Sequence, residues 1–348
     1  MRGKNPRIRG IHVGRTGHYT RDKGDTDRPK AVHFTVGECV SMRTMQTVTE
    51  KGLDHSILPM RLYHKAKKLG IWDPRDIDFT KDAEDWAGFS DIQRAILLRL
   101  CSLFQAGEEA VTRDLLPLIR AISLEGRLEE EMYLATFLWE EAKHTEVFRR
   151  FLDEVACEKN DLTAMHGPNY RAIFDTQLPA SMERLIHDPS PAAQAEASVT
   201  YNMVVEGVLA ETGYYAFYNM LQANGKMPGL LRAIGYLKKD ESRHIGYGTY
   251  LLSRLISEQD EIWQVVQRRI QQLMPYAVGV VSELFEVLNQ QLDAVAAAGE
   301  ELFELDQQDF MNYAMKQFQS RMNVLERARG KSVDEIYHVS EATVGVLD

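Results

Sequence analysis

Two short motifs in this 348-residue chain combine a carboxylate with an imidazole at helical spacing. Glu141-Ala142-Lys143-His144 and Glu241-Ser242-Arg243-His244 both read Glu-x-x-His. Residues three apart lie on the same face of a helix, so each motif directs one carboxylate and one imidazole toward the same point. One such motif occurs by chance in many surface helices, but a second copy makes a metal site the better interpretation.

An acidic residue also precedes each motif by the length of one helix. Glu108 lies 33 positions before Glu141, and Glu206 lies 35 positions before Glu241. A helix with Glu followed by a helix with Glu-x-x-His therefore occurs twice, which is the ligand set of di-iron and di-manganese carboxylate bundles. We predict that one ion is held by Glu108, Glu141 and His144 and the other by Glu206, Glu241 and His244. Spacing leaves open which glutamates bridge the two ions.

The residues around these acids indicate burial. Glu206 lies in the apolar run Met203–Leu209, where an uncompensated carboxylate would be costly to desolvate. Four buried carboxylates carry about four negative charges, which two divalent cations would cancel. Oxygen donors with one imidazole per metal favour iron or manganese, while ligand type alone leaves zinc possible.

Helical periodicity dominates the chain from about residue 58 onward, and no strand-like alternation competes with it. We expect long helices at about 91–123, 127–155, 191–224, 228–257, 261–290 and 307–329, with a shorter one at 169–187. Ser90 with Gln93 forms a capping-box pattern, and Ser190-Pro191 is typical of a helix start. Pro275 predicts a kink. These lengths predict an all-α, ferritin-like helical bundle with additional helices.

Composition narrows the function further. A formal net charge of -10 argues against general nucleic-acid binding. No apolar run reaches the ~18 residues that a membrane span needs. Three widely spaced cysteines fit a reducing cytoplasm better than a disulfide framework. We therefore expect a cytoplasmic enzyme without a transmembrane segment.

The N-terminal segment differs in composition from the rest. Residues 1–30 hold nine Lys or Arg against three Asp and few apolar residues. We expect residues 1–45 to form a disordered basic extension, with a nucleic-acid arm as the lesser alternative. A further hypothesis is that translation starts at Met42 or Met45, so that residues 1–41 are not natively translated. The ferritin-like domain is then expected at 46–330 and a C-terminal tail at 331–348.

Several motifs together resemble a known family. The sequence is similar to the small subunit of class I ribonucleotide reductase and, more closely, to the ligand-binding oxidases that share its fold. The resemblance runs from about residue 54 to residue 329. The segments that carry it are Trp72–Asp78, Gly107–Val111, Glu140–His144, Tyr201-Asn202 and Val205–Gly207.

Three positions separate the two groups. Reductase subunits usually place a radical tyrosine four residues after the first histidine, where this chain has Phe148. The ligand-binding oxidases carry a tyrosine five residues before the third glutamate and a valine three residues after the first. Here these are Tyr201 and Val111. By the resemblance, the pair is joined by an ether cross-link, although at 100° per residue Tyr201 would lie about 140° around the helix from Glu206.

The resemblance also implies residues that support the ligands. Asp240 corresponds to an aspartate that joins the first histidine to the early tryptophan, which suggests a hydrogen-bonded chain from His144 through Asp240 to Trp72. Tyr214 corresponds to a tyrosine near the metals. For both Trp72 and Tyr214, ordinary core packing is the alternative.

The function implied by the resemblance is an oxygen-activating oxidase with one manganese and one iron ion, a di-iron centre being possible. Its partners would be molecular oxygen, a long-chain fatty acid or similar apolar carboxylate, and an electron donor that the sequence does not identify. The chain could also form a homodimer. The alternative is a ribonucleotide reductase radical subunit, and metal storage is disfavoured because storage ferritins are shorter chains.

Overall fold

The protein is described here from a computed structural model, which describes residues 52–298 and 305–346. The helices, in chain order, are α1 (Leu58–Leu69), η1 (Pro74–Asp76), α2 (Thr80–Gly88), α3 (Asp91–Asp114), α4 (Leu116–Leu124), α5 (Leu128–Glu154), η2 (Thr163–Met165), α6 (Pro168–Arg171), η3 (Ala172–Gln177), α7 (Leu178–Arg184), α8 (Pro191–Ser198), η4 (Val199–Ala210), α9 (Glu211–Phe217), η5 (Tyr218–Gln222), α10 (Pro228–Glu258), α11 (Ile262–Ala298), α12 (Gln307–Ala328) and α13 (Val333–Tyr337). The basic extension at 1–45 and the hypothesis about Met42 and Met45 lie outside the described residues.

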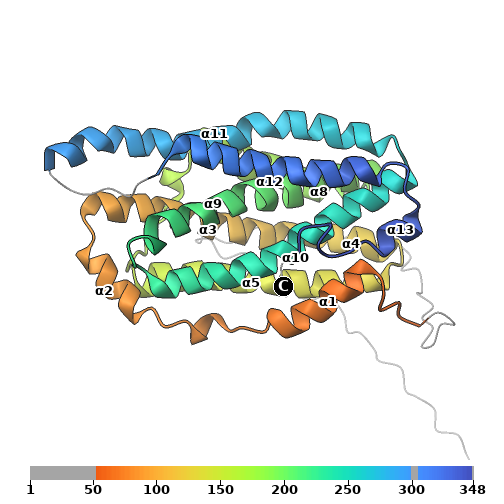
Figure 1. The fold of residues 1–348 in the computed structure, drawn as a ribbon, viewed down its shortest axis with the longest axis horizontal. Coiled ribbons are helices and arrows are strands. Elements are labelled where there is room, and N and C mark those ends of the chain that lie inside the picture. Colours follow the sequence, from red (N-terminus) through yellow and green to blue (C-terminus); the bar gives the residue numbers. More distant parts are fainter. Residues whose placement is uncertain (1–51, 299–304, 347–348) are drawn as a thin grey trace, which may run out of the picture. The chain divides into compact units, whose positions relative to one another are not determined.

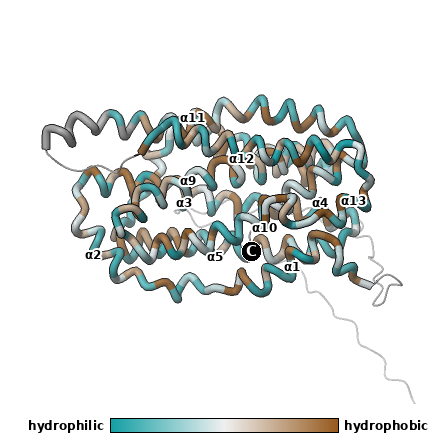
Figure 2. Tube along the Cα trace, in the orientation of Figure 1, coloured by the Kyte–Doolittle hydropathy of each residue, from teal (hydrophilic) through white to brown (hydrophobic). Residues whose placement is uncertain are grey.

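The all-α, ferritin-like bundle is confirmed, and the described part of the chain contains no strand (Figure 1). α3 packs against α5, and η4 packs against α10, so these four helices form the centre of the bundle. α1 lies against α5 and α10, while α11 and α12 cover η4 from the other side. Hydrophobic and hydrophilic residues alternate along most helices, as expected when one face of each helix is buried (Figure 2).

The predicted helix starts at Ser90 and Ser190 are confirmed. The Ser90 hydroxyl accepts from the Gln93 backbone N–H, and the Gln93 side chain accepts from the Ser90 N–H, which is a complete capping box. The Ser190 hydroxyl accepts from the Ala193 N–H at the start of α8. Both caps satisfy backbone donors that an uncapped helix end leaves without a partner.

The expected single helix at 91–123 is wrong in one respect, because it is divided. α3 ends at Asp114 and α4 begins at Leu116. Pro117 lies in the first turn of α4, where its missing N–H costs nothing. Inside one continuous helix the same proline would remove a backbone hydrogen bond, so the chain begins a new helix there. α11 instead continues through Pro275.

The expected helix at 191–224 is continuous but changes its winding. Val199–Ala210, which includes Glu206, forms a π-helix with α-helix on both sides. A π-helix bonds residue i to residue i+5 instead of i+4, so residues five apart come to lie over one another. Periodicity analysis at 100° per residue cannot anticipate this change.

The C-terminal segment predicted as a tail packs on the bundle within the described residues. Val344 and Val346 are buried, and a Cβ placed on Gly246 of α10 would lie 2.4 Å from the Val346 side chain. Glu341 pairs with Lys65 of α1 at 2.6 Å. None of the described helices has the length and apolar character needed to cross a membrane.

Candidate metal centre

Each of the four central helices contributes acidic or imidazole side chains to one buried point. Four of the six predicted donors belong to the Glu-x-x-His motifs of α5 and α10, and none of the six is more than 4% exposed. The six donors are Glu108 on α3, Glu141 and His144 on α5, Glu206 on η4, and Glu241 and His244 on α10.

The donor atoms form two overlapping groups, each able to hold one ion. One group is Glu108, Glu141, His144 and Glu241, and the other is Glu141, Glu206, Glu241 and His244. Within each group the donor atoms lie within 4.8 Å of one another. Glu141 and Glu241 belong to both groups, so they are the carboxylates placed to bridge two ions.

The imidazoles present their Nδ1 atoms to the carboxylates. His144 Nδ1 lies 3.5 Å from both Glu108 Oε2 and Glu141 Oε2. His244 Nδ1 lies 3.0 Å from Glu141 Oε1 and 3.5 Å from Glu241 Oε2. Donors bonded to one ion at about 2.1 Å and set at right angles are about 3 Å apart, so these separations suit a shared cation.

Several of these donor atoms have no hydrogen-bond partner among the described residues. They are both Glu141 oxygens, Glu206 Oε1, Glu241 Oε2 and the Nδ1 atoms of His144 and His244. Buried polar atoms are almost always satisfied, and a bound ion is one of the accepted explanations for exceptions. The convergence of unpartnered donors and uncompensated carboxylates therefore fits a centre of two divalent cations.

The other nitrogen of each ligand histidine is held by a carboxylate from the opposite motif. His144 Nε2 lies 3.4 Å from Asp240, which precedes Glu241, and His244 Nε2 lies 2.9 Å from Glu140, which precedes Glu141. Such outer carboxylates fix the tautomer and orientation of a ligand histidine.

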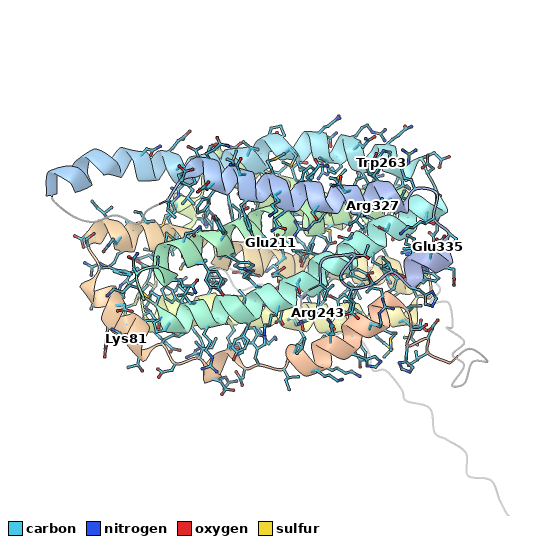
Figure 3. The ribbon with its side chains drawn as sticks, in the orientation of Figure 1. Lys81, Glu211, Arg243, Trp263, Arg327 and Glu335 are labelled. Atoms are coloured by element: carbon cyan, nitrogen blue, oxygen red, sulfur yellow. The ribbon has the colours of Figure 1, made fainter. Side chains whose placement is uncertain are left out.

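Arg243 connects these two outer carboxylates. It donates to Glu140 and Asp240 at 2.5 Å each, and it is fully buried on α10, where Figure 3 labels it. Of these three outer residues, the sequence analysis assigned a role in the site to Asp240 alone. The sequence signal that could have identified Glu140 is its position directly before a Glu-x-x-His motif, a position that Asp240 shares in the other motif.

Trp72, Asp240 and His144 lie in the order that the sequence suggested. Trp72 Nε1 donates to Asp240 Oδ2 at 2.9 Å, the same oxygen that faces His144. Lys143 donates to that oxygen at 3.1 Å and lies over the Trp72 ring, with its Nζ 4.2 Å from the ring centroid. The geometry is compatible with both an orienting chain and a packing role for Trp72.

Tyr214 and Phe148 line the side of the centre near α3. The Tyr214 hydroxyl donates to Glu241 at 3.3 Å and, more weakly, to Glu108 at 3.5 Å. Its ring stacks on Phe104, which also stacks on Phe148. Phe148 is fully buried, so no hydroxyl is available where a reductase subunit usually has its radical tyrosine.

Tyr201 and Val111 are in contact. The Tyr201 hydroxyl donates to the Val111 backbone carbonyl at 3.2 Å, and both residues are buried. The angular argument from an α-helix placed Tyr201 away from Glu206. The π-helix changes that result, because it brings residues five apart to the same face.

Asn202 on the same helix is a residue that sequence reasoning did not assign to the site. Its side-chain N–H donates to Glu206 Oε2 at 2.9 Å, and the Ser198 hydroxyl donates to the side-chain oxygen Oδ1 of Asn202 at 2.9 Å. A Cβ placed on Gly248 would lie 2.2 Å from the Asn202 side chain, so α10 approaches closely here. Asn202 thus holds Glu206 in a fixed orientation.

The buried donors have strongly shifted pKa values. Burial raises the pKa of Glu108 to about 8 and that of Glu206 well above its ordinary value. Burial also disfavours ionised Glu141, but His244 and His144 outweigh it and lower the pKa of Glu141 to about 2. The surrounding carboxylates likewise outweigh burial at both histidines, whose pKa values rise well above the ordinary range.

Metal binding should therefore release protons and weaken as the pH falls. Glu108, with a pKa of about 8, is mostly protonated at pH 7, and both histidines carry a proton that a metal must displace. We expect the affinity for Mn²⁺ to fall between pH 8 and pH 6 by about tenfold per pH unit for each proton released. Anaerobic titrations at pH 6, 7 and 8 measure this, and an affinity independent of pH would contradict it.

An apolar pocket opens onto the centre between α3, η4, α9 and α11. Glu108, Glu206 and Glu241 form part of its wall, and Val111 lies beside them. It contains about 760 Å³ of space free of protein atoms, including its open mouth. Most of the remaining wall is apolar and includes Leu100, Leu103, Phe174, Val205, Leu209 and Leu284.

The fold and donor set define a dimetal-carboxylate protein of the ferritin-like class. The family model described as "Ribonucleotide reductase, small chain" matches residues 60–322. The chain belongs to this family, within the group of R2-like ligand-binding oxidases, and is an oxidoreductase.

Solved structures of that group are similar over nearly their whole length. R2-like ligand-binding oxidase with an aerobically reconstituted Mn/Fe cofactor is 36% identical, with a TM-score of 0.75, and the match covers 83% of this chain and 99% of that chain. A valine-to-isoleucine mutant with the same cofactor is 38% identical, with a TM-score of 0.74 and coverage of 80% and 96%. A tyrosine-to-phenylalanine mutant with an anaerobically reconstituted Mn/Fe cofactor gives the same values.

Proposed function

We propose that this protein is an oxygen-activating oxidase with a mixed manganese–iron centre. Glu108, Glu141 and His144 would hold manganese, while Glu206, Glu241 and His244 would hold iron, with Glu141 and Glu241 as bridges. The observation that carries the proposal is the set of buried donor atoms without hydrogen-bond partners. The Mn/Fe cofactor of the similar oxidases supports the choice of metals. When bound in reduced form, the ions would supply electrons to molecular oxygen and generate an oxidant for a nearby C–H bond.

The residues of this chain would orient the centre and keep water from it. Asp240 and Glu140 hold the two histidines through Nε2, which leaves Nδ1 free for the ions. Asn202 fixes Glu206, and Tyr214 holds a proton at its hydroxyl next to Glu241 and Glu108. The apolar pocket wall excludes bulk water, which would otherwise compete for the oxidant.

The apolar lining of the pocket supports a long apolar ligand that carries a carboxylate, such as a long-chain fatty acid, as the molecule bound there. An apolar wall would hold the alkyl chain, and the two cations behind Glu108, Glu206 and Glu241 would attract the carboxylate. A reactive C–H bond of the ligand would then lie close to the centre. A two-electron oxidation at this centre would also join Tyr201 and Val111 by an ether bond, as the family resemblance implies.

We expect extraction of the purified protein to yield about one equivalent of a long-chain carboxylic acid. Ala210→Phe places a ring in the pocket wall and should lower that yield at least about tenfold, because the alkyl chain loses its space. Ala223→Phe makes the same change at an exposed position on the bundle and should leave the yield unchanged. Mass spectrometry of the extract measures the acid, and metal analysis should show two ions in all three proteins.

Equal yields from the two variants, or no carboxylic acid in the wild type, would contradict the ligand assignment. Oxygen uptake by the anaerobically loaded protein tests the oxidase reaction itself. A stable complex with a ribonucleotide reductase large subunit, without oxygen-dependent chemistry on a bound acid, would favour the radical-subunit alternative.

A further inference from the structure

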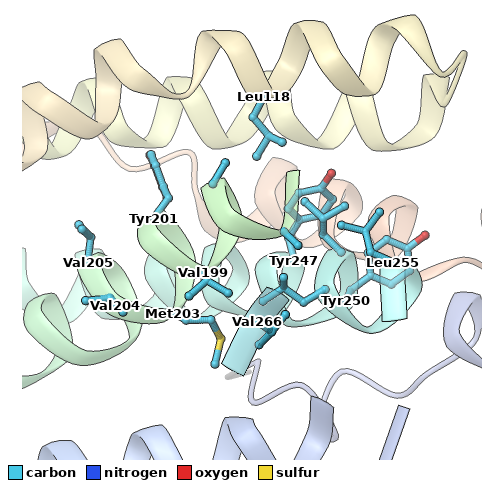
Figure 4. Packing of buried hydrophobic residues seen from close by; sticks show 14 of the residues in the cluster. Leu118, Val199, Tyr201, Met203, Val204, Val205, Tyr247, Tyr250, Leu255 and Val266 are labelled. Carbon is cyan, nitrogen blue, oxygen red and sulfur yellow. The ribbon is translucent and has the colours of Figure 1, made fainter. Parts of the chain in front are cut away.

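A row of aromatic residues leads away from the metal centre. Phe137 and Tyr133 lie four and eight residues before Glu141 on α5, while Tyr247 and Tyr250 lie three and six residues after His244 on α10. Successive members on each helix lie three or four residues apart, so each one neighbours the previous one on the helix surface. Tyr247 and Tyr250 belong to the same apolar cluster as Tyr201 (Figure 4).

The rings are in contact from the ligand histidine onward. Phe137 stacks on His244 with 3.7 Å between ring centroids, and it lies 6.1 Å from Tyr133. Tyr133 lies 5.2 Å from Tyr247, which lies 6.0 Å from Tyr250. The three separations among Phe137, Tyr133, Tyr247 and Tyr250 fall within the 4.5–7 Å range of interacting aromatic pairs, and the Phe137–His244 stack is closer. We refer to Tyr133, Tyr247, Tyr250 and Tyr337 as the tyrosine row.

Two phenols of the tyrosine row share one buried carboxylate. Tyr247 donates to Glu130 Oε2 at 3.0 Å, and Tyr250 donates to Glu130 Oε1 at 3.4 Å. Glu130 is 2% exposed, and Arg254 and Arg127 lie 3.5 Å and 3.7 Å from Oε1. Both arginines are placed to stabilise the ionised carboxylate, which is the form that can accept a proton from either phenol.

The tyrosine row ends in a partly exposed residue. Tyr337 on α13 lies 6.4 Å from Tyr250 between ring centroids, and its hydroxyl accepts from Arg127 at 2.8 Å. Tyr337 is half-buried, whereas the three other members of the row are fully buried. The row therefore connects a metal-ligand histidine to solvent at α13.

We propose that the tyrosine row is a hole-transfer path that carries oxidising equivalents from the metal centre to the protein surface when no substrate C–H bond is available. The inference rests on the proposed oxidase function. In each step an electron passes from Tyr247 or Tyr250 through Tyr133 and Phe137 to the oxidised centre. The phenolic proton moves to Glu130, which leaves a neutral tyrosyl radical. A one-electron reductant at the surface, such as an ascorbate-type enediol, returns an electron through Tyr337, and Glu130 returns the proton.

This role explains an arrangement that packing alone does not require. A buried phenol costs more to desolvate than a phenylalanine ring. The Glu130 carboxylate that the two phenols share also places a titratable acid in the core, which is a further desolvation cost. Both features are needed for proton-coupled oxidation, because a phenol loses its proton when it is oxidised. Burial raises the pKa of Glu130, with Arg254 and Arg127 acting against it, which makes the carboxylate a better proton acceptor.

The test determines which residue carries the radical and does not depend on measuring enzyme turnover. Anaerobically Mn/Fe-loaded protein, without added fatty acid, is mixed with oxygen and a nitroso spin trap, and adducts are located by peptide mass spectrometry. We expect an adduct at Tyr337 in the wild type. Tyr247→Phe and Tyr250→Phe should each lower it at least about tenfold, because both break the path while keeping the ring. Tyr313→Phe, a partly buried tyrosine outside the row, should leave the adduct unchanged.

Oxygen uptake and metal content, measured in the same samples, separate the two proposals. Uptake in the wild type with no adduct at Tyr337, or with an adduct that both variants retain, overturns the hole-transfer path alone. Absence of oxygen uptake by the fully loaded wild type overturns the oxidase function and the path with it. A lower adduct yield in both variants at unchanged metal content and unchanged uptake supports the path.

Discussion

Glu141→Ala is expected to remove both metal ions, with an affinity loss of more than about 100-fold at each position. Glu141 contributes to both donor groups, and neither of its oxygens has a hydrogen-bond partner among the described residues. Loss of an outer-sphere partner alone typically lowers metal affinity 10–100-fold, so loss of a shared ligand should cost more. Metal analysis after anaerobic loading with Mn²⁺ and Fe²⁺ measures the effect, and oxygen uptake should disappear with the metals.

Glu146→Ala is the matched control, because it changes the same residue type on the same helix at a half-exposed position that pairs with Arg75 at 3.6 Å. It should keep two ions per chain. Both variants should retain their helical circular dichroism, since apolar packing dominates the stability of such bundles. Two tightly bound ions in Glu141→Ala would contradict the assigned centre, as would a single zinc ion in the wild type that excludes iron and manganese.

The second large effect is expected at Tyr201 and Val111. Before exposure to oxygen, the metal-loaded protein should give separate peptides for these two residues. After exposure, the peptides should migrate as one species, lighter than their sum by two hydrogens. The reason is that an ether bond between the phenol oxygen and the valine β-carbon requires loss of the phenolic hydrogen and the β-hydrogen, which is a two-electron oxidation. The hydrogen bond from Tyr201 to the Val111 carbonyl already holds the phenol at this residue.

Tyr201→Phe should abolish the link completely and keep both metals, because the phenol belongs to neither donor group. Val111→Ala should weaken or abolish it, since a primary C–H bond is harder to break than the tertiary one of valine. Tyr313→Phe should leave the link intact, because Tyr313 lies on α12, away from the donor groups. Separate peptides after oxidation of a fully loaded wild-type protein would count against the cross-link and favour the radical-subunit alternative.

The sequence by itself predicted the bundle, and it identified six candidate donors that the structure brings together in one buried cluster. Glu-x-x-His is a local pattern, because residues three apart share a face of any α-helix. Two copies, each preceded by a glutamate one helix earlier, limit the arrangement to four facing helices. The helix starts at Ser90 and Ser190 could also be predicted from neighbouring residues alone, since a capping hydroxyl bonds to backbone groups two or three residues away.

Other helix ends depend on residues far away in the chain. α10 begins where Asp82 of α2 accepts from the backbone N–H groups of Gly229 and Leu230, at 2.8 Å and 2.7 Å. That capping carboxylate lies nearly 150 positions earlier, so local periodicity cannot identify it. The break before α4 required recognising that Pro117 favours a new first turn over a continuous helix.

Only the tertiary structure decided how the site is completed. Glu141 and Glu241 become the shared carboxylates because α5 and α10 pack so that both face the same pair of histidines. The outer carboxylates are exchanged between the two motifs, which no spacing within one helix predicts. Tyr201 comes into contact with Val111 because Val199–Ala210 is wound as a π-helix. This winding brings Tyr201, five positions before Glu206, toward the face of the helix that carries Glu206, whereas an α-helix would place the two residues about 140° apart.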